Sequence, residues 1–329
     1  MSSKFHDQFI KEYTVQLIRQ FFQKKNFHEV EIPVLLPSLP LEPDLYSFKT
    51  HWHHRQKNFY LATSPESSLK KLISLGIGDC FTISKAFRDL EDIGPTHNLE
   101  FSMLEWYEIN KNYRHIAKTT QKLILHIHHG IQKKTNTKAI NILKYHHQSI
   151  DLSPPWHQFT LCHLFQKYAN INLDQNLKDT PTNDSDWEPF FTKTMIDKIE
   201  PNLPQDKPVF IFDYPTRLSP LARRSLGEDG TPTNFSQRFE LYIAGMEIGN
   251  AYTELTDSVI MQKNFKKEKL YRQKHHLPSH PYDQKLIDST AKLPPCTGIA
   301  IGVDRLAMLF ADTTNITDVL YFPTSQLLK

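Results

Sequence analysis

The sequence predicts an α+β fold in which a mostly antiparallel sheet is flanked by helices. Two hairpins of alternating apolar and polar residues, at 81–107 and 237–257, predict the antiparallel strands. Apolar residues four apart over Phe5–Phe22 predict a helix with one buried face. Over Gly298–Phe310, small and branched residues alternate as far as Gly302 and an apolar run follows, which predicts a buried strand, a turn and a helix.

Two further strands are expected between the first helix and the first hairpin. One covers Phe27–Leu36, although Pro33 within it cannot donate to a ladder and so belongs at a strand end or an edge. The other, Phe59–Thr63, runs into Ser64-Pro65-Glu66, where serine can cap a helix and proline suits its first turn. Glu66 there either complements the helix dipole or faces a ligand held above the sheet.

The first hairpin concentrates ionisable side chains. Arg88 stands at the entrance of its loop and His97 at the exit. Because side chains alternate along a strand, Glu105 and Tyr107 share one face. A buried acid without a partner is costly, so this face is interpreted as a pocket with a cationic mouth and an acidic floor.

The second hairpin carries Glu247 and Glu254, seven residues apart. Strict alternation would place them on opposite faces, whereas a bulge at Gly249 would bring both carboxylates over one site. Carboxylates close to phosphates suit Mg²⁺. Arg305, in the turn after Gly302, has a planar cation that can lie on a purine ring. By itself that turn favours a packing role, and its partners upstream favour a nucleotide role.

Residues from about 110 to 205 are expected to form a helical insertion packed on the main domain, because helical spacing occurs at 113–129 and 161–168. A buried strand is expected at 208–215. We therefore expect one domain over residues 1–329.

Composition limits the classes of function. There are 39 Lys and Arg residues against 36 Asp and Glu, so bulk charge does not predict a protein that coats nucleic acid. Three widely spaced cysteines favour a reducing compartment over a disulfide framework or a zinc site. No signal core and no run of 18 apolar residues is present, which predicts a soluble cytoplasmic protein that does not associate with membranes.

Taken in order, these segments resemble the three motifs of class II aminoacyl-tRNA synthetases: the helix and strand ending at Pro33, the hairpin over 87–101, and Gly302–Arg305. The finer similarity is to the lysyl branch, and it is carried by Thr63–Glu66, Glu105–Tyr107, Gly245–Asn250, Glu254–Asp257 and Gly298–Gly302. With no anticodon-binding barrel expected, with Trp106, and with Ala300 where the synthetases usually have glycine, the chain is similar to the elongation factor P (R)-β-lysine ligase family.

This resemblance implies an ATP-dependent enzyme that adenylates (R)-β-lysine and transfers it to a lysine of elongation factor P. It implies Mg²⁺ as a cofactor and a homodimer, and tRNA is not expected as a substrate. It assigns the amino acid to Ser64, Pro65, Glu66, Glu105, Tyr107, Glu254 and Ala300. It assigns ATP to Arg88, Glu91, His97, Asn98, Phe101, Glu247, Ile248, Gly302 and Arg305, with Arg88 and Arg305 as catalytic residues and Glu247 and Glu254 as metal ligands.

The first hairpin loop is one residue longer than the family pattern. Leu90 stands where the family has an acidic residue, so Glu91 takes that part only if the loop bulges. Two other functions remain open: an enzyme that uses α-lysine or charges tRNA, and a non-catalytic binding paralogue. Ala300 discriminates between the two amino acids, because a methyl group in a close-packed pocket displaces the ligand.

Overall fold

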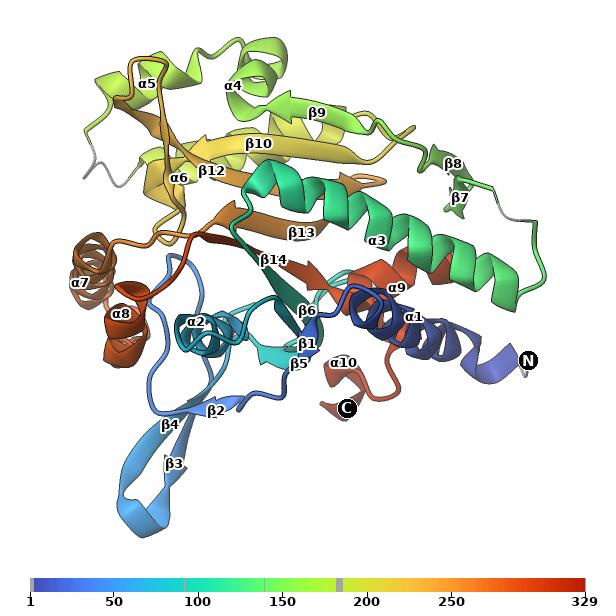
Figure 1. Ribbon diagram of the computed structural model, residues 1–329, viewed down its shortest axis with the longest axis horizontal. Coiled ribbons are helices and arrows are strands. Elements are labelled where there is room, and N and C mark those ends of the chain that lie inside the picture. The colour runs from blue at the N-terminus through green and yellow to red at the C-terminus, as the bar shows by residue number, and fades with distance from the viewer. Residues whose placement is uncertain (1–2, 92, 139, 182–185, 329) are drawn as a thin grey trace.

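A nine-stranded sheet organises the molecule (Figure 1). This computed structural model describes residues 3–91, 93–138, 140–181 and 186–328. In that part of the chain the strands lie in the order β1-β5-β6-β14-β13-β12-β10-β9, with β11 paired to β12. The strands are β1 (His28–Glu29), β5 (Cys80–Phe87), β6 (Glu100–Ile109), β9 (His157–Thr160), β10 (Val209–Pro215), β11 (Arg224–Leu226), β12 (Pro232–Ile243), β13 (Met246–Thr253) and β14 (Cys296–Gly302).

Most neighbouring strands of this sheet are antiparallel. The pairs β1–β5 and β9–β10 at its two edges are parallel, whereas the pairs from β5 to β10 and the β11–β12 pair are antiparallel. The two hairpins and the strand at 208–215 are confirmed. The turn of the second hairpin is Ala244-Gly245, and both residues have positive φ, as a two-residue hairpin loop requires.

Three helices pack on one face of the sheet: α1 (His6–Gln23), α3 (Tyr113–Lys134) and α9 (Val303–Ala311). They overlie the central strands in Figure 1 and share one apolar core with them. At its centre the ring of Phe22 stacks on that of Phe81, with centroids 4.7 Å apart, and lies 5.1 Å from the indole of Trp106. The amphipathic helix predicted over Phe5–Phe22 is therefore confirmed, together with its buried face.

The remaining elements surround the rim of the sheet. The other α-helices are α2 (Glu66–Ser74), α4 (Leu161–Leu164), α5 (Leu173–Asp179), α6 (Trp187–Thr194), α7 (Ser258–Lys274), α8 (Gln284–Thr290) and α10 (Thr324–Leu327). Short 3₁₀ or π turns are η1 (Ser3–Phe5), η2 (His53–Arg55), η3 (Phe165–Ala169), η4 (Met195–Ile199), η5 (Glu200–Asn202), η6 (Thr216–Leu218) and η7 (Ile316–Val319). The small hairpin of β7 (Ile142–Tyr145) and β8 (Gln148–Asp151) follows α3.

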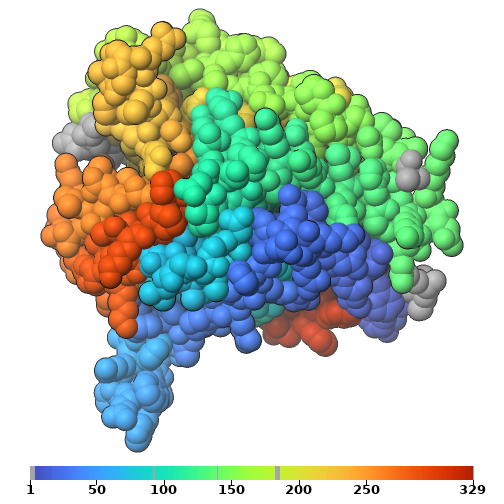
Figure 2. Space-filling view, viewed as in Figure 1, coloured from blue at the N-terminus to red at the C-terminus, as the bar shows by residue number. Residues whose placement is uncertain are grey.

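A second sheet forms an arm that projects from the body of the molecule (Figure 2). It contains β2 (Leu35–Leu36), β4 (Lys57–Leu61) and β3 (Lys49–Trp52), in that order. The expected strand over Phe27–Leu36 is wrong as one continuous element. His28 and Glu29 pair with β5, the chain then passes Pro33, and Leu35 and Leu36 pair with β4 of the arm. Proline cannot supply the ladder donor that a continuous strand would need.

The described part of the region from about 110 to 205 contributes to the core and to the main sheet, in addition to packing on the main domain. Its helix α3 belongs to the main core, and its strand β9 extends the nine-stranded sheet. Residues 139 and 182–185 lie outside the described residues. The helical insertion and the single domain over residues 1–329 stay predictions. In the described chain, no helix combines the length and the apolar character needed to cross a membrane.

Arg272 of α7 fixes the loop at 42–45, which returns to the sheet beside α2. Its side chain is completely buried and donates to the carbonyl oxygens of Glu42, Leu45 and Pro278 and to the carboxylate of Glu268. Its guanidinium carbon also lies 4.8 Å from the ring centroid of Tyr46. One buried cation therefore connects α7 to a loop far away in the sequence.

Arg272→Met should lower the free energy of unfolding by about 3–5 kcal/mol, because it leaves the partly buried carboxylate of Glu268 and three carbonyl groups without their donor. Denaturant unfolding followed by circular dichroism measures this loss. Lys274→Met is the matched control, because Lys274 is exposed on the same helix and its removal should change the free energy by less than about 0.5 kcal/mol. Equal effects of the two substitutions would contradict the role of Arg272.

Candidate active site

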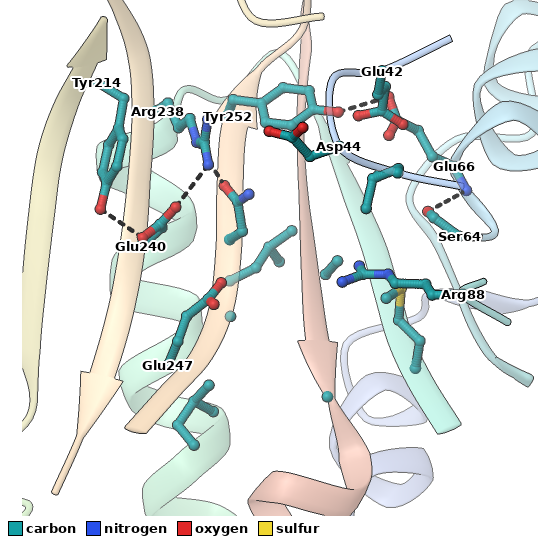
Figure 3. A pocket seen from close by; sticks show the side chains of 18 of the residues that line it. Glu42, Asp44, Ser64, Glu66, Arg88, Tyr214, Arg238, Glu240, Glu247 and Tyr252 are labelled. Atoms are coloured by element: carbon teal, nitrogen blue, oxygen red, sulfur yellow. Dashed lines mark hydrogen bonds and ion pairs between the residues drawn. The ribbon is translucent and has the colours of Figure 1, made fainter. Parts of the chain in front are cut away.

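A cavity of about 560 Å³ lies on the face of the sheet opposite to α1, α3 and α9 (Figure 3). Side chains of β6, β12, β13 and β14 form its floor, and the loop at 42–45 and residues of α6 close parts of its rim. All the predicted site residues line this cavity except Pro65, which occupies the cap position of α2. The structure therefore brings together predicted residues from four distant segments of the chain.

Strand alternation explains how one sheet serves both the core and the cavity. On β6, Leu104 and Trp106 face the helices, whereas Glu105 and Tyr107 face the cavity. On β14, Gly298, Ala300 and Gly302 face the cavity in the same way. In the register of the two strands, Gly298 lies opposite Tyr107, Ala300 opposite Glu105 and Gly302 opposite Met103.

A β-bulge on β13 places Glu247 on the same face. Leu241 of β12 pairs with Gly249, but its neighbour Tyr242 pairs with Glu247, so Ile248 is the extra residue. The bulge expected at Gly249 is therefore present, one residue earlier. Because it shifts the alternation by one, Glu247 and Glu254 both line the cavity.

Arg88 and Arg305 line one part of the cavity, which is therefore cationic. Arg305 donates to the carbonyl oxygens of Thr96, at 3.1 Å, and Glu247, at 2.9 Å, and its Nη2 lies 2.6 Å from His97 Nε2. The Arg88 guanidinium carbon lies 5.2 Å from the ring centroid of Phe101. Arg88 Nε is buried and has no hydrogen-bond partner among the described residues. One arginine is thus fixed, and the other keeps a donor for a ligand.

The loop after Arg88 brings Glu91 to this cationic part. Leu90 adopts positive φ and its side chain points into solvent, so the loop bulges as the assignment of Glu91 requires. The Glu91 carboxylate lies 3.9 Å from Arg88 Nη1 and 3.4 Å from His97 Nε2. Asn98 lies behind them, where its side chain accepts from the Thr324 amide of α10. The ATP roles of these residues stay predictions.

Glu105 forms the centre of the acidic part. Its two carboxylate oxygens accept from Ser64 Oγ, at 2.9 Å, and from the Tyr107 hydroxyl, at 2.7 Å. Its side chain is almost completely buried. Burial and the nearby charge of Glu66 raise the pKa of Glu105 to about 8, against the opposing effect of its two hydrogen bonds.

Lys70, which the sequence analysis missed, joins two of the predicted substrate residues. Its ammonium contacts Glu66 Oε1 and lies 2.5 Å from Glu254 Oε2, and its side chain is 1% exposed. The Tyr252 hydroxyl also donates to Glu66 Oε1, at 2.6 Å. Glu66 and Lys70 are four residues apart on one helix, so the sequence already indicates that they are neighbours. Such pairs are usually exposed to solvent, which is why the pair did not indicate a site. Only the distant Glu254 makes this pair part of the site.

Three further charged residues line the cavity that the sequence did not single out: Arg238 and Glu240 on β12, and Glu42 in the loop at 42–45. Arg238 donates to the side chain of Asn250, at 3.0 Å, and to that of Glu240, at 2.7 Å. The hydroxyl of Tyr214 donates to the other oxygen of Glu240, at 2.6 Å. The sequence signal for Arg238 and Glu240 was their alternation along the first strand of the second predicted hairpin. Burial raises the pKa of Glu42 to about 8.

The donor set of the cavity can be compared with that of a magnesium site. No cluster of three or more His, Cys, Asp or Glu residues suited to an ion is found among the described residues. Mg²⁺ bound with phosphate groups needs only one or two carboxylates. Glu247 fits, because its side chain is 41% exposed beside Arg305. Glu254 already has one carboxylate oxygen, Oε2, in contact with the Lys70 ammonium. The metal role of Glu254 stays a prediction.

Comparison with known proteins shows the family of the chain. A family model described as tRNA synthetases class II (D, K and N) matches residues 2–326. A lysine–tRNA ligase of Saccharolobus solfataricus is 32% identical over 330 residues, which cover 95% of this chain and 63% of that protein. A lysine–tRNA ligase of Burkholderia multivorans is 33% identical over 326 residues, which cover 94% of this chain and 62% of that protein. The chain therefore spans less than two thirds of these two relatives.

A third relative is matched over most of its own length. The elongation factor P–(R)-beta-lysine ligase of Buchnera aphidicola subsp. Schizaphis graminum is 32% identical over 314 residues, which cover 93% of this chain and 91% of that protein.

Gly298→Ala should displace Tyr107, because the added methyl carbon would lie 2.5 Å from the Tyr107 ring. The ring is buried, so overpacking should lower the free energy of unfolding by about 1–3 kcal/mol, measured by denaturant titration. Gly302→Ala is the matched control on the same strand, because a methyl carbon there meets no side chain closer than 3.9 Å. A stability loss in the control as large as at Gly298 would show that Tyr107 is not the cause.

Proposed function

The chain belongs to the class II tRNA synthetases of the D, K and N type, and from this premise we propose that it uses ATP to activate a diamino acid as its adenylate. Membership confirms the resemblance and the fold class that the sequence predicts. The observation that carries the proposal is the single cavity, in which a cationic part with Arg88 and Arg305 adjoins an acidic part with Glu66, Glu105 and Glu254. ATP suits the first part and ammonium groups suit the second.

In the proposed complex, adenine lies between the ring of Phe101 and the guanidinium of Arg305. Arg88 then lies near the α-phosphate, where its Nε has a hydrogen bond to give. Glu247 would hold Mg²⁺, which supplies positive charge to the phosphate oxygens when it is bound. At the acidic part, Glu105 and Tyr107 receive one ammonium group, and Ser64 keeps the Glu105 carboxylate in place.

The chemical step is an in-line displacement at the α-phosphorus. A carboxylate oxygen of the amino acid forms a bond to phosphorus, the bond from the α-phosphorus to the bridging oxygen breaks, and pyrophosphate leaves. Negative charge grows on the α-phosphoryl oxygens, and Arg88 offsets it. No general base is needed, so positioning and fixed charge carry the step.

For the second step we propose transfer to a protein. The ε-amine of an acceptor lysine attacks the carbonyl carbon of the adenylate, AMP leaves with the bonding electron pair, and the amine loses a proton to give an amide. The similarity to the elongation factor P–(R)-beta-lysine ligase of Buchnera supports (R)-β-lysine as the amino acid and elongation factor P as the acceptor. The proposed homodimer rests on the resemblance of α1 and Pro33 to the first synthetase motif.

A second candidate is an enzyme that activates α-lysine for tRNA, which the similarity to lysine–tRNA ligases favours. Pyrophosphate exchange with L-lysine, (R)-β-lysine and (S)-β-lysine, followed by transfer assays with elongation factor P and with tRNA, tests both candidates. We expect exchange to be fastest with (R)-β-lysine and label to appear on elongation factor P. Transfer to tRNA alone would favour the second candidate, and no exchange with any amino acid would refute both.

Ala300→Gly should shift selectivity toward L-lysine. Ala300 lies between Glu105 and Asn250 in the sheet register, so its methyl group occupies the floor where the amino acid must lie. One methyl group in a pocket changes selectivity by about 10- to 200-fold. The ratio of kcat/KM for L-lysine over (R)-β-lysine measures the shift, and KM for ATP should not change. An unchanged ratio would contradict this part of the proposal.

Amino-acid binding should strengthen as pH rises toward about 8. Below that pH the Glu105 carboxyl is mostly protonated, because its pKa is raised, and a neutral carboxyl attracts an ammonium group less than a carboxylate does. KM for the amino acid should therefore fall between pH 6.5 and about 8.5 and then level off, while KM for ATP changes little. Glu105→Gln should weaken this pH dependence without abolishing it, because burial also raises the pKa values of Glu42 and Glu254 in the same cavity to about 8. A KM that rises with pH in the wild-type enzyme would contradict the assignment.

A further inference from the structure

Lys70 lies behind the wall of the cavity and not in it. It is fully buried and absent from the lining, whereas its partners Glu66 and Glu254 both line the cavity. The ammonium also lies 5.2 Å from the ring centroid of Tyr252, whose hydroxyl is bonded to Glu66. A substrate therefore meets the two carboxylates first and cannot touch Lys70 without displacing them.

Lys70 uses one oxygen of each carboxylate. It contacts Glu66 Oε1 and Glu254 Oε2. The other two oxygens, Glu66 Oε2 and Glu254 Oε1, accept no hydrogen bond from the residues that the structure describes. Both oxygens of Glu254 are buried, and only Oε2 has the Lys70 ammonium beside it. A buried acceptor without a donor is costly, and Glu254 Oε1 is such an acceptor. It therefore favours a ligand that donates to it and to the unbonded Glu66 Oε2.

The charges of the three side chains determine what that ligand can be. When both carboxylates are ionised, the three side chains leave one negative charge at this place. Two buried carboxylates without a cation would repel each other and retain a proton. A single ammonium group, with three donors and one positive charge, matches both the two open oxygens and the remaining charge.

We propose that Lys70 is a positioning residue that orients Glu66 and Glu254 to bind a single ammonium group of the substrate. This inference rests on the proposed function. It separates two ammonium subsites in the acidic part: one at Glu66 and Glu254, prepared by Lys70, and one at Glu105 and Tyr107. The substrate class is then an amino acid with two amino groups, and a monoamino acid of the same length fills only one subsite.

Lys70→Ala tests the role of the charge. We expect kcat/KM for the diamino acid to fall by about 100-fold or more, on the scale of removing one partner of a buried charge pair, while KM for ATP stays within about twofold of the wild-type value. Lys71→Ala is the matched control, because Lys71 is the next residue of α2 and pairs with Asp283, away from the cavity. It should keep wild-type kinetics.

Chemical rescue separates a charge from a packing role. The truncated Lys70→Ala side chain leaves space for a small alkylammonium ion, so n-propylamine should restore at least about tenfold of the lost kcat/KM, and n-propanol should not. Equal rescue by amine and alcohol, or rescue by neither in a folded protein, would overturn the proposal. Folding is checked by thermal unfolding of each variant.

A double-mutant cycle covers the case in which Lys70→Ala does not fold. Lys70→Met should cost at least about tenfold less in kcat/KM when Glu254 is already changed to Gln, because the charge it balances is then gone. Equal costs in the two backgrounds would refute the coupling. The proposed function fails separately: in that case the wild-type enzyme gives no exchange dependent on a diamino acid, whereas failure of this inference leaves wild-type exchange intact and the Lys70 variants unaffected.

Discussion

The site depends on the need to balance buried carboxylates within one closed part of the cavity. The exposed fractions of Glu66, Glu105 and Glu254 are 6%, 2% and 0%. A buried charge without a partner costs several kcal/mol, and the partners come from different elements: Ser64 before α2, Tyr107 on β6, Tyr252 on β13 and Lys70 on α2. These elements must therefore pack in one arrangement for the carboxylates to be tolerated. The same contacts stabilise the fold and shape the site.

The cationic part is built differently. Arg88 and Arg305 keep 29% and 20% of their side chains exposed, so solvent bears part of their charge. Arg305 is nevertheless fixed by two carbonyl oxygens and His97. A flat cation held in place before a ligand arrives needs no reorganisation on binding, which is the condition under which fixed charges contribute most. Rigid elements thus hold Arg305 in place for the proposed stacking on adenine, and Arg88 Nε has no hydrogen-bond partner among the described residues.

Local pattern predicted the elements and the faces of β6 and β14, because alternation is a property of neighbouring residues. Alternation also showed that Glu247 and Glu254 can face the same site only if one bulge lies between them. It failed where the deciding partner is remote. The single strand predicted after α1 is in fact divided between two sheets. His28 and Glu29 pair with β5, whereas Leu35 and Leu36 pair with β4. From the sequence alone, Lys70 resembles a surface lysine, and only the fold shows that Glu254 contacts it. Arg238 likewise resembles a charge at the edge of a strand, and only the fold shows its contacts with Glu240 and Asn250.

The arrangement of charge also gives the proposed substrate a direction. An amino acid carries its ammonium groups and its carboxylate at different places, and here the acidic part and Arg88 adjoin in one cavity. The substrate's own charges would turn its carboxylate toward the arginine side, where the α-phosphate lies in the proposed complex. Between the two parts, the floor is formed by Gly298, Ala300 and Gly302, and only the middle residue carries a methyl group. In the proposed complex, fixed charges therefore set the orientation of the substrate. The Ala300 methyl group would limit how deep the substrate backbone can lie, which is where α- and β-amino acids differ.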